Sequence, residues 1–241
     1  YGANIGNEVS PLRPMQAYSA MFPSFYQAEE QPIALNMTWE GKDDNAGYWA
    51  TEEKNLVAGF EKRVRPEMDR GTHFSVFALA PIPLLVKLGT LLTDKTPCLV
   101  HQLQREPAQS WAWTNADIDT HYILSEPDKD DHRPPALIVA LSASIAYSRI
   151  HEALGHEAAI WQLTIDAPHN DFLKTELQLS RFREAVRKLM VRIAERHGQA
   201  TRLSIFPAIP VATAVEMGRV RMPKADMPWV LYDHNNKTCA F

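Results

Sequence analysis

The sequence predicts an α/β fold made of two related units, each with a mainly parallel sheet. Three observations support this prediction: an internal repeat, a buried-type strand in the second half, and a regular alternation of strands and helices over residues 135–233. The 241 residues are enough for one large domain or two small ones. With 45% hydrophobic and 22% charged residues, the composition excludes wholesale disorder, collagen-like structure and coiled coils.

The internal repeat aligns residues 74–89 with residues 203–218 without gaps. Each copy has the pattern of a strand, a proline-containing turn and a helix, followed by a second short apolar strand after Pro97 or Pro228. Proline suits the first turn of a helix because its missing N–H is no loss there. The alternative is a chance likeness between two strand–turn–helix units. The identical pairs are Ser75/Ser204, Phe77/Phe206, Pro81/Pro210, Val86/Val215 and Gly89/Gly218.

The context upstream favours a true repeat. In each half, a strand-like segment (33–40 or 159–166) precedes a long helical segment (51–68 or 172–197). Gly198 stands where a glycine commonly ends a helix. The second helical segment is predicted from one apolar stripe at helical spacing, formed by Phe182, Val186, Leu189 and Ile193.

The second half contains one further unit. Residues 135–141 are a continuous apolar run, which is typical of a strand buried in a parallel sheet. Ser142-Ala143-Ser144 then leads into a helix that continues to about Leu154 and ends at Gly155. The resulting order of strands and helices implies right-handed crossovers. The first half has no obvious counterpart of this unit.

A polar, proline-rich segment, residues 126–135, is a candidate linker between the halves. It suggests an N-terminal extension (1–30), a first half (31–127) and a second half (135–241). Residues 1–134 carry 12 basic and 19 acidic side chains, a net −7, whereas the remainder carries 13 and 10, a net +3. The overall charge of −4 therefore conceals an acidic half joined to a basic one, and it argues against direct binding of nucleic acid by charge.

Signatures of common enzyme classes are missing. His151 and His156 lie five residues apart, whereas a zinc-protease helix needs a spacing of four. The sequence has no phosphate-binding glycine loop, dinucleotide fingerprint, nucleophile elbow or Cys-x-x-Cys. Cys98 and Cys239 alone cannot form a disulfide framework. We therefore expect no catalytic residues, metal or cofactor.

Targeting signals are also missing from the sequence. No stretch approaches the roughly 20 apolar residues that a membrane-spanning helix needs. No signal peptide is visible, and the expected location is the cytoplasm. Basic residues in the helix at 172–197 fit a solvated helix face better than a nucleic-acid surface, because acidic residues and the apolar stripe complete an ordinary amphipathic pattern.

A ligand site is expected at the carboxyl ends of the strands, where helix N-termini present free N–H groups. The strand-to-helix turns there are 80–81, 142–144, 166–170 and 207–210, and three of the four lack acidic residues, which suits phosphate. Tryptophans near cationic and amide groups suit the stacking and pairing of bases. Core packing is the alternative for each tryptophan, and helix capping for the serines. The candidate ligand-binding residues are Lys42, Trp49, Pro81, Gln102, Arg105, Trp111, Ser142, Ser144, His169, Asn170, Pro207, Ala208, Pro210, Tyr232 and His234.

Several segments together resemble the SAVED domain. They are residues 77–83 with Gly89, residues 205–210 with Gly218-Arg219-Val220 and Pro223-Lys224, and the segments 163–166, 179–183 and 231–233. The resemblance covers about residues 30–238. It implies two fused CARF-like, Rossmann-like units that act as a sensor in bacterial anti-phage signalling (CBASS). It is strongest to SAVED domains that follow an HNH endonuclease, and a first residue of Tyr1 instead of Met fits an effector domain that is absent here.

The resemblance implies a cyclic di- or trinucleotide ligand, with a cyclic dinucleotide such as a cGAMP isomer expected, made by a CD-NTase-type nucleotidyltransferase. Binding would drive self-association and activate the fused nuclease, with the second-half turns on one side of the ligand and the Pro81 turn and residues 105–111 on the other. Two alternatives stay open. One is a phosphodiesterase that opens the ring, with His169 or His234 as acid or base. The other is a ligand-independent oligomerisation module.

Overall fold

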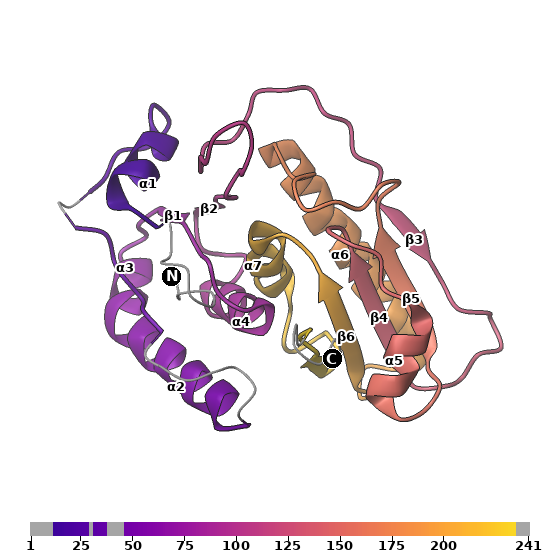
Figure 1. Ribbon diagram of the computed structural model, residues 1–241. Coiled ribbons are helices and arrows are strands. Elements are labelled where there is room, and N and C mark those ends of the chain that lie inside the picture. Colours follow the sequence, from indigo (N-terminus) through magenta and orange to yellow (C-terminus); the bar gives the residue numbers. More distant parts are fainter. Residues whose placement is uncertain (1–11, 29–30, 38–45, 235–241) are drawn as a thin grey trace.

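The computed structural model describes residues 12–28, 31–37 and 46–234, and its strands form two sheets (Figure 1). A two-stranded parallel sheet holds β1 (Phe74–Val76) and β2 (Cys98–Val100). A five-stranded sheet has the order β3-β5-β4-β6-β7, and all its neighbours are parallel except β3 and β5. The predicted α/β class with mainly parallel sheets is therefore confirmed. The strands of the larger sheet are β3 (Ile123–Ser125), β4 (Pro135–Ala140), β5 (Ala159–Thr164), β6 (Leu203–Ala208) and β7 (Trp229–Leu231).

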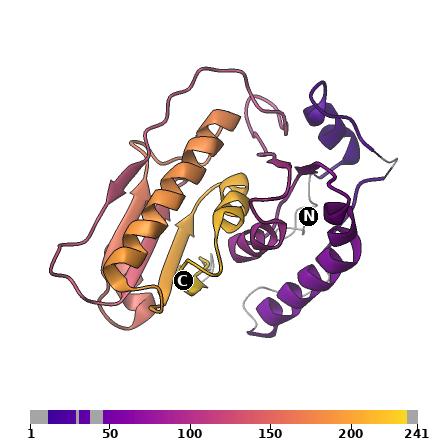
Figure 2. The same cartoon turned by 180° about the vertical axis from the view of Figure 1, so that it is seen from behind.

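Helices cover both faces of the five-stranded sheet (Figures 1 and 2). The predicted stripe of α6 is fully buried against one face, beside α7, and Ile150 of α5 is buried on the other. None of the helices in the described parts of the chain is long and apolar enough to cross a membrane. The helices are α1 (Pro14–Met21), α2 (Ala46–Arg63), α3 (Arg65–Asp69), α4 (Ile82–Leu92), α5 (Tyr147–Leu154), α6 (Glu176–His197) and α7 (Val211–Val220).

The internal repeat is confirmed at the level of single hydrogen bonds. β1 pairs with β2, and β6 with β7, starting from equivalent residues. Pro81 and Pro210 precede α4 and α7, and each accepts the N–H four residues later, at 3.1 and 3.0 Å. The equivalent strand-end bonds run from Phe74 N–H to Pro97 O (2.9 Å) and Leu203 N–H to Pro228 O (2.8 Å), and from His101 N–H to Val76 O and Tyr232 N–H to Ile205 O (both 2.9 Å).

The two repeat helices, α4 and α7, touch backbone to backbone at their glycines. A Cβ atom on Gly89 would lie 1.9 Å from the carbonyl oxygen of Val215, and a Cβ on Gly218 would lie 1.9 Å from that of Val86. Val86 and Val215 are themselves a repeat pair, so the contact is reciprocal. Because no side chain fits at this crossing, the glycines of the repeat set how closely the two halves approach.

Some predicted elements differ in the structure. Residues 31–37 contain no strand, only a bridge at Asn36, and residues 38–40 of the predicted strand lie outside the described residues. The helix predicted over 51–68 is split into α2 and α3, because Pro66 has no N–H to donate to the preceding turn. The sequence did not predict β3, which adds residues 123–125 of the first half to the larger sheet.

The helices of the second half also begin later than predicted. The helix after the serine turn starts at Tyr147. The helix predicted from residue 172 starts at Glu176, where Thr175 and Gln178 form a capping box. The predicted ends are confirmed, since Gly155 has a φ of 70° and Gly198 follows the last turn of α6.

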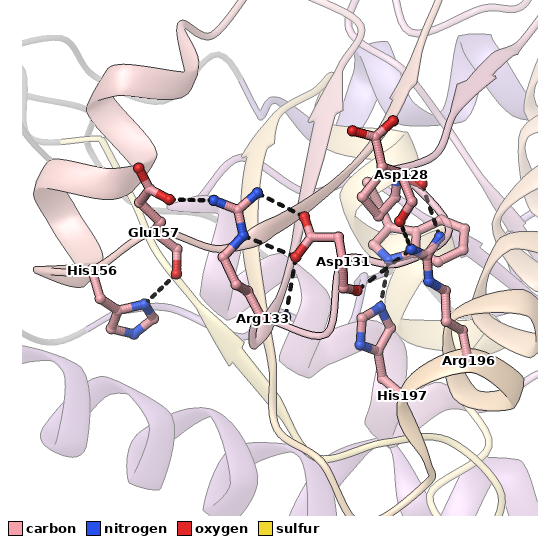
Figure 3. Close-up of polar contacts among 9 residues, drawn as sticks. Asp128, Asp131, Arg133, His156, Glu157, Arg196 and His197 are labelled. Carbon is pink, nitrogen blue, oxygen red and sulfur yellow. Dashed lines mark hydrogen bonds and ion pairs between the residues drawn. The ribbon is translucent and has the colours of Figure 1, made fainter.

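The segment between the halves is held against the second half by charged side chains (Figure 3). Arg196, near the end of α6, donates hydrogen bonds to the backbone carbonyls of Pro127 (2.9 Å) and Asp128. Arg133 pairs with Asp131 inside the segment at 2.7 Å, and its hydrogen bond lowers the pKa of the Asp131 carboxyl group to about 2. Arg133 also pairs with Glu157, which precedes β5. The segment identified as a linker is therefore anchored to the end of α6 and to Glu157.

The glycine crossing gives a test of the fold. Gly89→Ala and Gly218→Ala should each lower the free energy of unfolding by at least about 3 kcal/mol, because the helices must separate to admit the methyl group. Urea denaturation followed by circular dichroism measures this change. Gly59→Ala in α2 is the control: its Cβ would meet only the flexible Leu35 side chain, at 3.3 Å, so a change below about 1 kcal/mol is expected. Equal effects at the three glycines would contradict the close crossing.

Candidate functional site

All of the second-half candidates lie at the carboxyl edge of the five-stranded sheet, in or after the last residues of its strands. β4 ends at Ala140, two residues before Ser142, and the chain after β5 passes through His169. Two backbone bonds tie these turns together: the Ser142 N–H donates to the Ala208 carbonyl (2.8 Å), and the His169 N–H donates to the Leu141 carbonyl (3.1 Å). The candidates that end or follow these strands are Ser142, Ser144, His169, Asn170, Pro207, Ala208, Pro210, Tyr232 and His234.

Each half also has an aromatic pair at its strand ends. The Tyr232 ring stacks on Phe206 with centroids 4.4 Å apart and planes 16° apart. The His101 ring stacks on Phe77 with centroids 4.3 Å apart and planes 12° apart. The four residues occupy equivalent positions in the repeat, so the duplicated fold places related aromatic groups at the end of each sheet.

The two halves are bonded to each other at this edge through the chain that leaves β2. Gln102 accepts the N–H of Ala212, in the first turn of α7, at 3.1 Å. Gln104 donates to the carbonyl of Leu173, before α6, at 2.9 Å. Both glutamines are buried, with 8% and 4% of their surface exposed. These two hydrogen bonds join the first half to the second. We call the residues that form them the inter-half junction: Gln102, Gln104, Leu173 and Ala212.

Arg105 follows the junction directly. Gln104 and Ser110 form an antiparallel bridge through backbone bonds of 2.7 and 3.1 Å, and residues 105–109 form the exposed turn between them. Within the described part of the chain, Arg105 makes no ion pair or side-chain hydrogen bond. Its guanidinium is therefore available to an anionic ligand.

Three first-half candidates lie elsewhere or cannot be placed. Trp111 is 1% exposed and packs edge-on against Phe77 with centroids 5.5 Å apart, so its indole is buried. Trp49 lies in the first turn of α2, away from the carboxyl edge of the large sheet, and packs against Tyr48 (Figure 1). Lys42 lies outside the described residues. Pro81 precedes α4, as predicted.

Two buried hydrogen-bond acceptors sit in the chain that leaves β2. The Nδ1 of His101 lies 3.1 Å from the Trp111 carbonyl, which makes Nδ1 the protonated nitrogen, and its Nε2 has no partner among the described residues. The Oε1 of Gln104 likewise has none there. Buried polar atoms in native proteins normally have a hydrogen-bond partner, so each of these two acceptors has room for one more donor, such as a water molecule.

Among the residues that the structure describes, His, Cys, Asp and Glu side chains form no group of three that could hold a metal ion. A cavity of about 1030 Å³ lies in the first half, between α1, residues 31–37 and β1, and another of about 510 Å³ lies between β3 and α6. Of the candidate ligand residues, Trp111 lines the first and none lines the second.

Comparison with known protein families assigns the chain to one of them. The model of the SAVED family, described as "SMODS-associated and fused to various effectors sensor domain", matches residues 56–241. The chain belongs to the SAVED family. The resemblance found in the sequence is therefore confirmed, whereas a specific kinship to HNH-fused members stays a prediction. No curated protein matches this chain.

Solved structures agree with the SAVED fold. The Acinetobacter baumannii Cap4 SAVED/CARF-domain receptor with the cyclic trinucleotide 2′3′3′-cAAA matches with a TM-score of 0.57 and 15% identity, over 83% of this chain and 45% of that one. The Moraxella osloensis Cap4 receptor matches with a TM-score of 0.51 and 14% identity, over 86% and 46%. This SAVED domain therefore spans less than half of those receptors. The likeness confirms the predicted Rossmann-like, CARF-type architecture.

His101 and Gln104 lie at the same edge of this SAVED domain but are not among the predicted ligand-binding residues. The signal available in the sequence is the polar run His101-Gln102 with Gln104, directly after a strand. Such residues lie at the carboxyl edge wherever the strand ends there. Sequence alone does not show which of them turn inward, because that depends on the neighbouring half.

The buried His101 predicts a pH-dependent stability. Burial lowers its pKa to about 4, against the opposing hydrogen bond to Trp111, whereas an unfolded histidine has a pKa of about 6.5. Between these values the unfolded chain binds a proton that the folded chain does not. The free energy of unfolding should therefore fall by about 3 kcal/mol as the pH is lowered through this window.

Urea denaturation at several pH values, with wild type and His101→Asn compared, measures this contribution. The variant should lose that part of the pH dependence. His156→Asn is the matched control, because His156 is exposed. An unchanged pH profile in His101→Asn would show that His101 does not titrate as inferred.

Proposed function

We propose that this SAVED domain is the ligand-sensing part of a bacterial anti-phage effector and binds a cyclic oligonucleotide at the carboxyl edge, where its two halves meet. The observation that carries the proposal is the inter-half junction. There, backbone turns and polar side chains from both repeats of a sensor-family fold lie together. The bound trinucleotide of the A. baumannii Cap4 receptor, a protein of the same fold, supports the class of ligand.

The chemistry of the edge suits a nucleotide with several phosphates. The turn predicted at 207–210 is shorter in the structure, because Pro207 and Ala208 belong to β6 and only Ile209 and Pro210 connect that strand to α7. Val211 is the first residue of α7, and its N–H has no partner within the helix. The exposed Ser144 offers a hydroxyl, and Arg105 an unpaired cation. Tyr232, stacked on Phe206, offers an aromatic surface for a base. We propose either a cyclic dinucleotide, as the sequence resemblance implies, or a trinucleotide of the kind held by the related receptor.

The remaining features of the proposal concern the whole protein. Residues 31–127 and 135–241 form the two CARF-like halves, preceded by an extension at 1–30. The parent protein carries an N-terminal HNH nuclease, and the ligand comes from a CD-NTase-type nucleotidyltransferase in the cytoplasm. This chain binds the ligand without chemistry of its own and self-associates when it is bound.

Binding is tested by calorimetry with cyclic di- and trinucleotides, including 2′3′3′-cAAA and 3′3′3′-cAAA. At least one should bind the wild type at micromolar concentration. Arg105→Ala should weaken that binding by about 1–3 kcal/mol, the usual contribution of a charge-assisted contact to phosphate. Arg202→Ala is the matched control, because Arg202 is exposed and precedes β6 at the opposite edge of the sheet. No binding by the wild type would overturn the proposal, and equal effects of the two substitutions would exclude Arg105 from the site.

A phosphodiesterase is the second candidate function, and His169 is the observation that favours it. This histidine is exposed at the carboxyl edge, and its Nδ1 lies 2.8 Å from the Ala167 carbonyl. That hydrogen bond leaves Nε2 available as a base. Incubation of protein and bound ligand overnight, followed by chromatography, separates the two functions. An intact ligand excludes the enzyme, whereas linear products would replace the sensor proposal.

Self-association has a separate test. The acidic first half and the basic second half favour head-to-tail contacts between copies of the chain. Ligand should therefore produce oligomers in light scattering, and raising the salt from 50 to about 500 mM should weaken them, because salt screens charges between exposed surfaces. Oligomers that form equally well without ligand would favour an oligomerisation module. Ligand-induced oligomers that resist salt would contradict the charge-based contact.

A further inference from the structure

The chain that leaves β2 is fixed to the second half at two points. The amide oxygen of Gln102 accepts the N–H of Ala212 at 3.1 Å, which caps α7 at its first turn. The amide nitrogen of Gln104 donates to the Leu173 carbonyl at 2.9 Å. The Nε2 of Gln102 also donates to the next carbonyl in its own chain, that of Leu103, at 3.1 Å. Both side chains are buried, so water does not readily replace these bonds.

Gln104 also begins the turn that carries Arg105. Gln104 pairs with Ser110 through two backbone hydrogen bonds, of 2.7 and 3.1 Å, and Arg105 is the next residue in the chain. Trp111, on the far side of the bridge, is buried in a cluster with Leu79 and Leu103. The base of the turn is therefore fixed on both sides, while residues 105–109 are exposed.

We propose that Gln102 and Gln104 act as positioning residues that hold the Arg105 turn against the carboxyl edge of the second half. This inference rests on the proposed function, because it gives Arg105 its place beside an anionic ligand. The glutamines themselves need not touch that ligand. Their effect on binding passes through the position of the Arg105 guanidinium.

The hydrogen bond between Gln102 and Ala212 has no equivalent at the corresponding positions of the repeat. By strand register, Gln102 corresponds to Asp233, and by helix position Ala212 corresponds to Pro83. Proline has no backbone N–H. A bond equivalent to the one between Gln102 and Ala212 therefore cannot form between the end of β7 and the second residue of α4. The glutamine pair makes the site asymmetric, although the fold around it is duplicated.

A double-mutant cycle tests the proposal on the 241-residue chain. Methionine resembles glutamine in size but cannot replace its hydrogen bonds, so the variants are Gln104→Met, Arg105→Ala and the two combined. The ligand is the cyclic oligonucleotide of the panel above that binds wild type most tightly. Gln104→Met should weaken binding about tenfold, and the double variant should bind within about twofold of Arg105→Ala, because the two residues then act as one unit.

Gln109→Met is the matched control. It makes the same substitution on the same turn, at an exposed residue, and should leave the affinity unchanged. Additive losses in the double variant, or an equal loss in Gln109→Met, would overturn the positioning role. A loss of affinity in Gln104→Met that remains in full when Arg105 is already alanine would instead make Gln104 a direct contact.

Hydrogen exchange measured without ligand tests the bonds themselves. Gln102→Met should increase the exchange rate of the Ala212 amide, and Gln104→Met that of the Ser110 amide. Unchanged exchange at both amides in folded variants would overturn the proposal, whatever the ligand. If wild type binds no member of the panel, the proposed function and the link to Arg105 fail together. Exchange then decides only whether the glutamines fix the turn.

Discussion

The close crossing of α4 and α7 is the contact on which the arrangement of the two halves depends. The glycine of each helix meets the carbonyl of the partner's valine, and Cβ atoms on Gly89 and Gly218 would come within 1.9 Å of backbone oxygen. Helices that touch this closely cannot slide or rotate without a backbone clash. The two sheets are therefore held in one geometry relative to each other, and so are the groups of both halves at the carboxyl edge.

α7 belongs structurally to both halves. At its start, Gln102 of the first half accepts the Ala212 N–H. Near its end, the buried Arg219 donates to the carbonyls of Thr93 (3.2 Å) and Thr96 (2.9 Å), which connect α4 to β2. Arg219 also pairs with the buried Glu216 at 2.5 Å, so its charge is balanced. Because breaking a buried pair leaves an uncompensated charge, this end of α7 resists displacement. α7 is therefore held by the first half at both ends.

Sequence predicted the parts of this structure that depend on local pattern. The apolar stripe of α6, the buried run of β4 and the glycine ends of α5 and α6 follow from periodicity and backbone chemistry, and the repeat followed from direct alignment. Contacts between segments that lie far apart in the sequence could not be predicted from local pattern. β3 forms because the chain returns to pair with β5, and Trp111 is buried because the residues around Leu79 and Leu103 enclose it. The sequence predicted that the candidate site lies at the carboxyl edge of the sheet, because the ends of the strands define that edge. The inward turn of Gln102 and Gln104 depends on α7 and on the loop before α6.

Duplication and divergence act on different parts of the molecule. The repeat is retained in strand register, helix starts, the Phe77–His101 and Phe206–Tyr232 stacks and the glycine crossing. It diverges at the carboxyl edge: Gln102 accepts the N–H of Ala212 in α7, whereas the corresponding residue of α4 is Pro83, which has no N–H. A site built from two identical junctions would favour a ligand with the same twofold symmetry. In the proposed site, one bonded junction with Arg105 on a single side therefore makes the two halves chemically unequal, although the fold around them is duplicated.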